Sequence, residues 1–232
     1  MAYVSKRRKA HSQVDKFKIH SLKEAIALVK QHSVEKFIPT IDIAIRLGID
    51  PKKSDQVVRG SSVLPNGTGR SVRVAVMTQG DNIQKALDAG ADLVGFADLA
   101  DKIAEDATAG KFEFDILIAS PDAMGQIGKL ARVLGPKGLM PNPKTGTVTA
   151  DVAKAVKNAK AGQVSFRNDK AGILHTLVGK KSFTDESLFE NVKSLVADVK
   201  RLKPSTSKGH FIKKVVLSST MGPGIQVDVS EF

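Results

Sequence analysis

Hydrophobic and polar residues alternate in both terminal thirds of the chain, and this alternation predicts strands. Ile41, Ile43 and Ile45 are separated by polar or small residues, among them Thr40 and Asp42. A period of two is typical of a strand that buries one face and exposes the other. The same reasoning predicts further strands around Val57–Leu64, Gln163–Arg167, Ile173–Val178 and Phe211–Ser219.

Two helices and a turn complete the terminal thirds. Ser21 followed by Glu24 forms a capping box ahead of an apolar-periodic helix that runs through Val29. A second helix is predicted after its expected N-cap Thr184, and its apolar stripe consists of Leu188, Val192, Leu195, Val196, Val199 and Leu202. Asn168–Gly172 is rich in turn-forming residues and predicts a hairpin between two of the strands. The terminal thirds therefore predict an α+β domain, an antiparallel sheet with two helices.

The middle of the chain reads as strand and helix in turn. The predicted elements are Val72–Met77, Asn82–Ala89, Leu93–Phe96, Leu99–Ala107, Phe114–Ala119 and a helix from Pro121. Asp98 and Ser120 are the expected N-caps of the last two helices. After the long loop Gly135–Thr147 a further helix is predicted near Asp151–Asn158. Such alternation favours a parallel sheet covered by helices, a Rossmann-like βαβ domain.

The distribution of charge separates the same two parts. Residues 69–159 hold 11 Lys or Arg against 11 Asp or Glu, so the net charge of +12 is carried by the two ends. Residues 1–68 contain 13 basic and 6 acidic side chains, and residues 160–232 contain 12 and 7. We therefore expect an α/β two-domain protein, with 1–68 and 160–232 forming one basic domain and 69–159 inserted into it. A basic domain of this kind favours nucleic acid as the partner.

Several chemistries are excluded or disfavoured by the composition. There is no cysteine, and the five histidines are scattered without metal-ligand spacing or a catalytic arrangement. Gly67–Val72 precedes a strand and lacks the third glycine of a dinucleotide fingerprint, and no phosphate loop ending in Gly-Lys-Ser/Thr occurs. We expect no catalytic residue, no metal and no cofactor. No apolar run of 18 residues occurs, which favours a cytoplasmic protein without a membrane partner.

Three segments carry candidate binding chemistry, and each also has a plain structural interpretation. Ser218–Gly224 offers hydroxyl groups and glycines for contacts to RNA, although such a sequence also suits an ordinary turn at a strand end. Lys36 and Phe37 could extend the neighbouring strand and present a cation and a ring, whereas Phe37 could equally be a core residue. Gly135–Thr147, with three prolines and three glycines, is compatible both with an ordered connection and with a ligand-binding loop.

Several sequence motifs of the chain resemble those of the family of bacterial ribosomal protein L-one, the stalk protein of the large subunit. They are Gly135–Lys144 (Gly-Pro-Lys-Gly-Leu-Met-Pro-Asn-Pro-Lys), Ser54–Gly60, Arg167–Lys170 and Thr220–Pro223. The resemblance implies a terminal RNA-binding domain whose contacts fall on Lys36, Phe37, Thr40, Asp42, Lys170, Thr220, Met221 and Gly222. Ser219 stands where threonine is expected, and Ala171 stands where a larger polar residue is common.

The partners are implied by this resemblance alone. They are the large-subunit 23S rRNA of the mobile stalk, the deacylated tRNA at the exit site, the leader of the protein's own messenger, and other large-subunit components. The resemblance thus implies a structural ribosomal protein that assists tRNA release and represses its own translation. The alternative is a two-lobed protein that binds a nucleotide or another small ligand through the middle domain.

Overall fold

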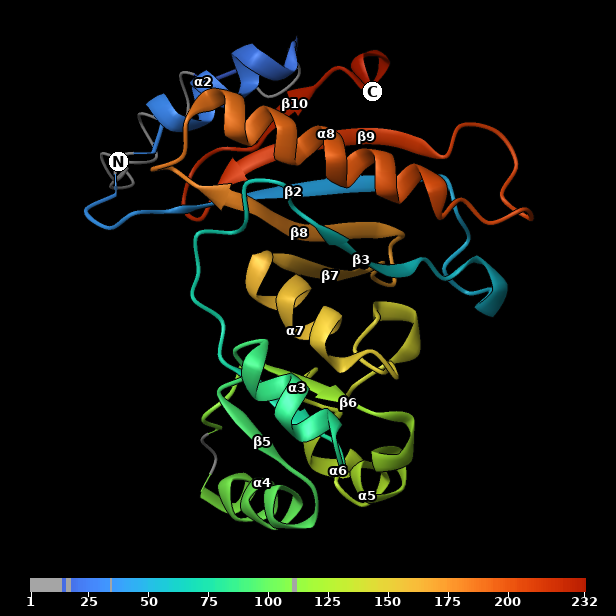
Figure 1. The fold of residues 1–232 in the computed structure, drawn as a ribbon. Helices are drawn as coiled ribbons and strands as arrows, with labels where there is room; N and C mark the ends of the chain where they lie inside the picture. Colours follow the sequence, from blue (N-terminus) through green and yellow to red (C-terminus); the bar gives the residue numbers. More distant parts are fainter. Residues whose placement is uncertain (1–13, 16–17, 34, 110–111) are drawn as a thin grey trace, which may run out of the picture. The chain divides into compact units, whose positions relative to one another are not determined.

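A computed structural model describes residues 14–15, 18–33, 35–109 and 112–232 of the mixed α/β chain (Figure 1). The chain divides into two compact units. Unit 1 consists of the residues up to Gly69 together with Val164–Phe232, and unit 2 consists of Arg70–Gln163. The basic run Lys6–Lys9 lies outside the described residues. No helix in the described ranges is both long and apolar enough to cross a bilayer.

A five-stranded sheet forms the centre of unit 1. Its order is β1 (Ile19–His20), β10 (Ile225–Val227), β9 (Ile212–Ser219), β2 (Thr40–Leu47) and β8 (Ile173–Lys180). Neighbouring strands run antiparallel except β1 and β10, which are parallel. The predicted antiparallel sheet is therefore confirmed for three of the predicted strands, β9, β2 and β8. β1 and β10 were not predicted, because two or three residues are too short to show a period.

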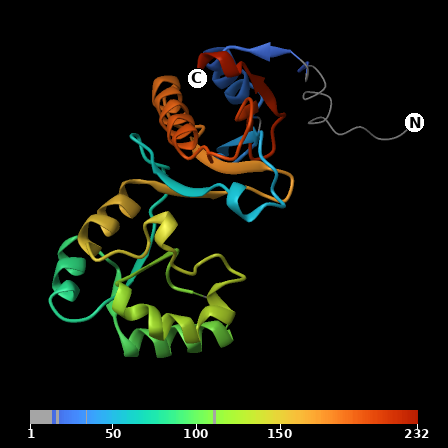
Figure 2. The same cartoon turned by 90° about the vertical axis from the view of Figure 1, so that its right-hand side faces the viewer.

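Helices α2 (Leu22–Gln31) and α8 (Asp185–Arg201) pack on one face of this sheet (Figures 1 and 2). Both predicted N-caps are confirmed, since Ser21 Oγ accepts from Glu24 N at 3.3 Å and Thr184 Oγ1 accepts from Ser187 N at 3.2 Å. The predicted apolar face of β2 and most of the apolar stripe of α8 lie buried between the layers. Local capping and a shared apolar interior thus explain why these residues adopt these elements.

The expected hairpin between β7 (Gln163–Arg167) and β8 is wrong. β7 pairs with β3 (Arg59–Val63) in a separate two-stranded sheet, and between Asn168 and Leu174 there is only an isolated bridge. Asn168 explains the difference, because its N–H donates to Val58 O at 3.1 Å and its Oδ1 accepts from Val58 N at 2.8 Å. This exchange ties the end of β7 to the segment that leads into β3. The short 3-10 helices Ser54–Gln56 and Val229–Glu231 complete unit 1.

Unit 2 contains a parallel three-stranded sheet of order β5 (Leu93–Gly95), β4 (Val74–Met77) and β6 (Ile116–Ala119). Buried residues form one cluster on each side of this sheet. The remaining elements are α3 (Asn82–Asp88), α4 (Ala97–Ala109), α5 (Met124–Lys129), α6 (Ala131–Leu134), α7 (Val152–Ala161) and the 3-10 helices Pro121–Ala123 and Pro143–Thr145.

Of the two caps predicted in unit 2, the Asp98 cap is wrong and the Ser120 cap is confirmed in position only. Helix α4 begins at Ala97, so Asp98 lies inside its first turn and is not the cap. A carboxylate at that position still interacts favourably with the helix dipole. Ser120 does occupy the N-cap position of the 3-10 helix that follows β6, but its hydroxyl makes no capping bond and instead donates to Met77 O at 3.5 Å.

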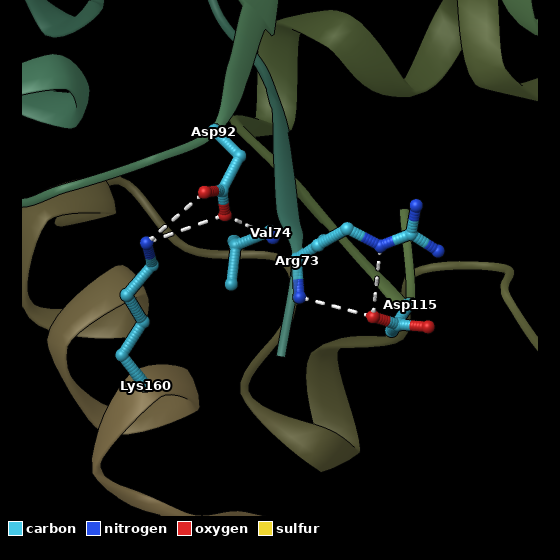
Figure 3. A network of polar contacts seen from close by, with 5 residues as sticks. All are labelled: Arg73, Val74, Asp92, Asp115 and Lys160. Atoms are coloured by element: carbon cyan, nitrogen blue, oxygen red, sulfur yellow. Dashed lines mark hydrogen bonds and ion pairs between the residues drawn. The ribbon is translucent and has the colours of Figure 1, made fainter. Parts of the chain in front are cut away.

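Two carboxylates hold the beginning of β4 (Figure 3). Asp92 Oδ2 accepts from Val74 N at 2.8 Å and lies 3.2 Å from Lys160 Nζ. Asp115 Oδ2 accepts from Arg73 N at 3.0 Å and from Arg73 Nε at 3.4 Å. The hydrogen bonds from the backbone of Val74 and Arg73 are the main cause that lowers the pKa of Asp92 and of Asp115. Charge-assisted hydrogen bonds therefore hold the first residues of β4 in place.

We expect unit 2 to lose stability in acid through these two groups. A carboxyl whose pKa is depressed in the folded state contributes stability above its unfolded pKa of about 3.9, and this contribution is lost as the pH falls through the folded pKa. Asp92→Asn and Asp115→Asn should each lower the free energy of unfolding at pH 7 by about 0.5–1 kcal/mol, because both side chains are near half exposed and solvent screens them. Urea unfolding between pH 7 and pH 3 measures this, with Asp101→Asn on α4 as control. If the free energy of unfolding of both variants varied with pH as in the wild type, the two carboxylates would not be the source of the acid sensitivity.

Candidate nucleic-acid interface

Thr40 and Thr220 join two of the predicted binding segments at one end of the five-stranded sheet. Thr220 N donates to Thr40 O at 3.0 Å, and Thr220 Oγ1 both accepts from Thr40 N at 3.0 Å and donates to Thr40 O at 3.2 Å. A hydroxyl has one proton and two lone pairs, so the Thr220 hydroxyl keeps one acceptor site for a further donor. Its first role in this structure is to fix the 219–222 turn against the start of β2.

Gly222 shapes the turn that follows β9. Its N–H donates to Ser219 O at 3.0 Å, and a Cβ at this position would lie only 2.1 Å from Ser219 Oγ. Ser219 is 4% exposed, and its hydroxyl has no hydrogen-bond partner among the described residues. The hydroxyl that replaces the expected threonine at position 219 therefore points into unit 1 and is not displayed on the surface. A side chain at position 222 would therefore displace the Ser219 hydroxyl from its present position.

Lys36 and Phe37 do not extend the strand as the sequence suggested. They lie in a bend ahead of β2, which begins at Thr40. The segment is held on the other side by Lys181 N, which donates to Pro39 O at 3.0 Å. Because the backbone bends, Phe37 is 54% exposed and is not a core residue. Ile38 and, in the facing turn, Met221 are also exposed, so this end of the sheet combines apolar side chains with the exposed Lys36.

The face of the sheet opposite α2 and α8 carries polar and basic residues. Asp42 lies on this face, opposite Ser218 of β9 and Leu177 of β8. Arg46 is exposed further along β2, opposite Lys214, and His175 is exposed on β8. The predicted polar face of β2 is therefore confirmed. It extends the Thr40–Thr220 end into a larger surface that has hydrogen-bonding groups and positive charge.

Lys170 is not brought together with the other predicted residues. Its turn joins β2 at the opposite end, where Leu47 N donates to Gly172 O at 2.9 Å. Seven steps of a strand separate Thr40 from Leu47, a distance of about 23 Å. The two halves of the predicted site thus lie at the two ends of one strand. A ligand that contacts both must follow β2 along its length.

The turn that carries Lys170 is held by Asp169. Its Oδ1 accepts from Ala171 N and from Ile173 N, both at 2.8 Å, and its Oδ2 lies 3.7 Å from His175 Nε2. The bond from Ile173 is the main cause that lowers the pKa of Asp169. Because the N–H of Ala171 already has this partner, position 171 offers neither a polar side chain nor an unused N–H to a ligand. Lys170 is exposed at the tip.

The Gly135–Thr147 loop of unit 2 is ordered by its own hydrogen bonds. Asn142 N donates to Thr147 Oγ1 at 2.8 Å, and Asn142 O accepts from Thr145 Oγ1 at 3.0 Å. The chain then pairs with the end of β6, where Thr149 N donates to Ala119 O at 3.1 Å. These bonds support the interpretation of the loop as an ordered connection. They do not test a ligand-binding role for its lysines.

The chain is thus a mixed α/β protein whose five-stranded sheet carries an extended polar and basic surface on one face. Among the described residues, no group of three or more His, Asp or Glu side chains could hold a metal ion.

Comparison with known proteins identifies the family. The chain belongs to the Ribosomal protein L1p/L10e family, whose model matches residues 29–223. It is 58% identical over 229 residues to the large ribosomal subunit protein uL1 of Mannheimia succiniciproducens, which covers 98% of each chain. The uL1 proteins of Pasteurella multocida and Haemophilus influenzae are each 56% identical over 229 residues, again 98% of both chains. The resemblance predicted from the sequence is confirmed, and as a ribosomal protein of this family the chain is not an enzyme.

Proposed function

We propose that this protein is a structural constituent of the large ribosomal subunit that binds 23S rRNA at the mobile stalk beside the tRNA exit site, in the cytoplasm. It assists the release of deacylated tRNA, and it represses translation of its own messenger by binding a similar RNA fold in the leader. In this proposal unit 1 is the RNA-binding domain and unit 2 is a Rossmann-like inserted domain. Other large-subunit components are its further partners.

The observation that carries this proposal is the surface formed by β2 and its two ends. The bonds between Thr40 and Thr220 place Lys36, Phe37 and Met221 at one end, and Lys170 lies at the other. Single-stranded and folded RNA is recognised by stacking, by contacts to 2′-hydroxyls and by neutralisation of phosphates. The exposed Phe37 ring can stack on a base, the remaining lone pair of Thr220 Oγ1 can accept from a 2′-hydroxyl, and the exposed Lys36 and Lys170 can neutralise phosphates. The family match covers unit 2 as well as unit 1, so the alternative of a nucleotide-binding protein is not proposed.

Titration of the full chain with a stalk-region rRNA fragment and with a scrambled RNA of equal length tests the RNA-binding part. We expect a clear preference for the native fragment over a range of salt concentrations. Competition by the protein's own messenger leader tests the repressor role, and the rate of deacylated tRNA dissociation from ribosomes with and without the protein tests the third role. Equal affinity for the native and scrambled RNA would overturn the proposal.

Lys36→Ala should weaken binding of the rRNA fragment about fivefold at 0.15 M salt, because one phosphate contact contributes roughly 0.7–0.9 to the slope of log K against log salt. The slope itself should fall by about that amount. Lys193→Ala is the matched control, since Lys193 is also exposed on unit 1 but lies on α8, which packs on the other face of the sheet. A slope that does not change in Lys36→Ala would remove this side chain from the interface.

A further inference from the structure

A hollow of unit 1 lies beyond the end of β2 that is opposite to Thr40. It has a volume of about 660 Å³ and is lined by, among others, Gly48, Lys208, Gly209, His210, Lys213 and Ser230. Gly48 directly follows β2, and its N–H donates to Phe211 O at 2.7 Å. The hollow therefore lies at the end of the strand that also carries the Lys170 turn. None of its lining residues was among those predicted from the sequence to bind RNA.

The lining of the hollow includes basic side chains but no carboxylate. Lys208 and Lys213 are exposed, His210 lies between them in the chain, and no residue of the lining is acidic. Within the described part of the chain, no ion pair involves these three side chains. Two unpaired ammonium groups and an imidazole around one cavity favour an anion as its occupant.

The acidic residues nearest along the chain are Asp50, Asp228 and Glu231, and each accepts a hydrogen bond from a backbone N–H. Asp50 Oδ1 accepts from Lys52 N at 3.2 Å. Asp228 Oδ1 accepts from Ser230 N at 2.9 Å, and this bond is the main cause that lowers the pKa of Asp228. Glu231 Oε2 accepts from Leu22 N at 3.0 Å. All three carboxylates thus have hydrogen-bond partners of their own, and none forms an ion pair with the lysines of the hollow in the described structure.

The wall of the hollow is built from closely packed backbone. A Cβ at Gly48 would lie 2.2 Å from His210 O, so the 208–211 segment rests directly on the end of β2. Gly209 has a φ of +78°, and a Cβ added there would meet no atom within 4 Å. Its backbone therefore faces open space, while its carbonyl accepts from Lys203 Nζ at 3.4 Å. A glycine that is fixed on one side and open on the other allows a ligand to approach the backbone closely.

We propose that this hollow, defined by Lys208, Gly209, His210, Lys213 and Ser230, is a phosphate-binding site. Ammonium groups and an imidazole beside an open glycine can donate hydrogen bonds to a tetrahedral oxyanion. The phosphate is either part of an RNA backbone or a free phosphate group, and both share this chemistry. The RNA source rests on the proposed function and deepens it: an RNA that follows β2 from the Thr40–Thr220 end reaches a second electrostatic contact at the far end.

The test compares two double variants of the full chain that lose the same charge. Lys208→Ala with Lys213→Ala removes both lysines of the hollow, whereas Lys23→Ala with Lys193→Ala removes the two lysines beside the Phe189 ring in the helical layer. If RNA supplies the phosphate, the first variant should bind the stalk-region rRNA fragment about 20-fold more weakly at 0.15 M salt, with a slope reduced by roughly 1.5. The control variant should bind like the wild type.

A titration with inorganic phosphate distinguishes the free ligand from RNA. If the site takes free phosphate, backbone NMR signals of 208–213 should shift in the wild type and remain in place in the Lys208→Ala and Lys213→Ala double variant. Two results together would overturn the site while leaving the proposed function intact. The double variant would bind the rRNA fragment with the affinity and salt dependence of the wild type, and inorganic phosphate would shift no NMR signal of the wild type. If the wild type shows no preference for the rRNA fragment, the proposed function fails and the phosphate titration alone decides the site.

Discussion

Asn191→Leu should lower the free energy of unfolding of the protein by about 3–5 kcal/mol, the largest effect of any single substitution considered. Asn191 is fully buried on α8, where its Nδ2 donates to Val178 O at 2.8 Å and to Gly67 O at 3.1 Å. Its Oδ1 accepts from Asn66 N at 3.0 Å. Leucine has a similar volume but leaves three backbone groups without partners, and each unsatisfied group costs about 1–3 kcal/mol.

Urea unfolding of the full chain measures this loss, and Asn66→Ala is the graded control. That substitution removes only the side-chain bonds of Asn66 to Ser187 O and Glu190 Oε2 at the surface, and it leaves the bond from its N–H to Asn191. We expect it to cost less than 1 kcal/mol. If Asn191→Leu were as mild as Asn66→Ala, the buried amide would not hold the 66–67 segment to β8 and α8.

Gly222→Ala should both destabilise unit 1 by about 1–3 kcal/mol and weaken binding of the rRNA fragment. The new Cβ would lie 2.1 Å from Ser219 Oγ, so either the buried Ser219 hydroxyl must leave its rotamer or the turn between β9 and β10 must move. Thr220 and Met221 are within this turn, and the bonds between Thr220 and Thr40 depend on its position. Chemical unfolding and RNA titration of the same variant measure the two effects.

The double variant Gly222→Ala with Ser219→Ala provides the decisive comparison. Ser219 Oγ has no hydrogen-bond partner in the described structure, so Ser219→Ala alone should change stability little. In the double variant the clashing oxygen is gone, and the nearest remaining atom, Ser219 Cβ in the wild type, lies at 3.4 Å. Stability and RNA affinity should therefore return close to the wild type, a coupling of about 1–2 kcal/mol. Independent, additive effects would show that the contact between these two residues does not determine the turn.

The sequence predicted the long elements of this fold because their signals are local. The alternation in β2, the apolar stripe of α8 and the caps at Ser21 and Thr184 are each contained within one element. The parallel sheet of unit 2 was expected for a related reason, since alternating strands and helices leave few other connections. The family followed from continuous phrases such as Gly135–Lys144, and the family comparison confirms it.

The candidate site was predicted only in its parts. Bonds between residues far apart in the chain decide how those parts meet: Thr220 contacts Thr40 across 180 positions, and Asn168 contacts Val58 across 110. The first bond turns the Thr220 hydroxyl toward the protein, and the second pairs β7 with β3 instead of β8. A third long-range bond, from Leu47 N to Gly172 O, places Lys170 at the far end of β2.

The long elements, the basic character of the two ends and the family can all be predicted from the amino-acid sequence. The strand pairing, the grouping of predicted residues at one end of the sheet and the cationic hollow at the other are visible only in the folded chain. Periodicity and capping act over a few residues, whereas strand register and side-chain proximity depend on hydrogen bonds and packing between distant segments.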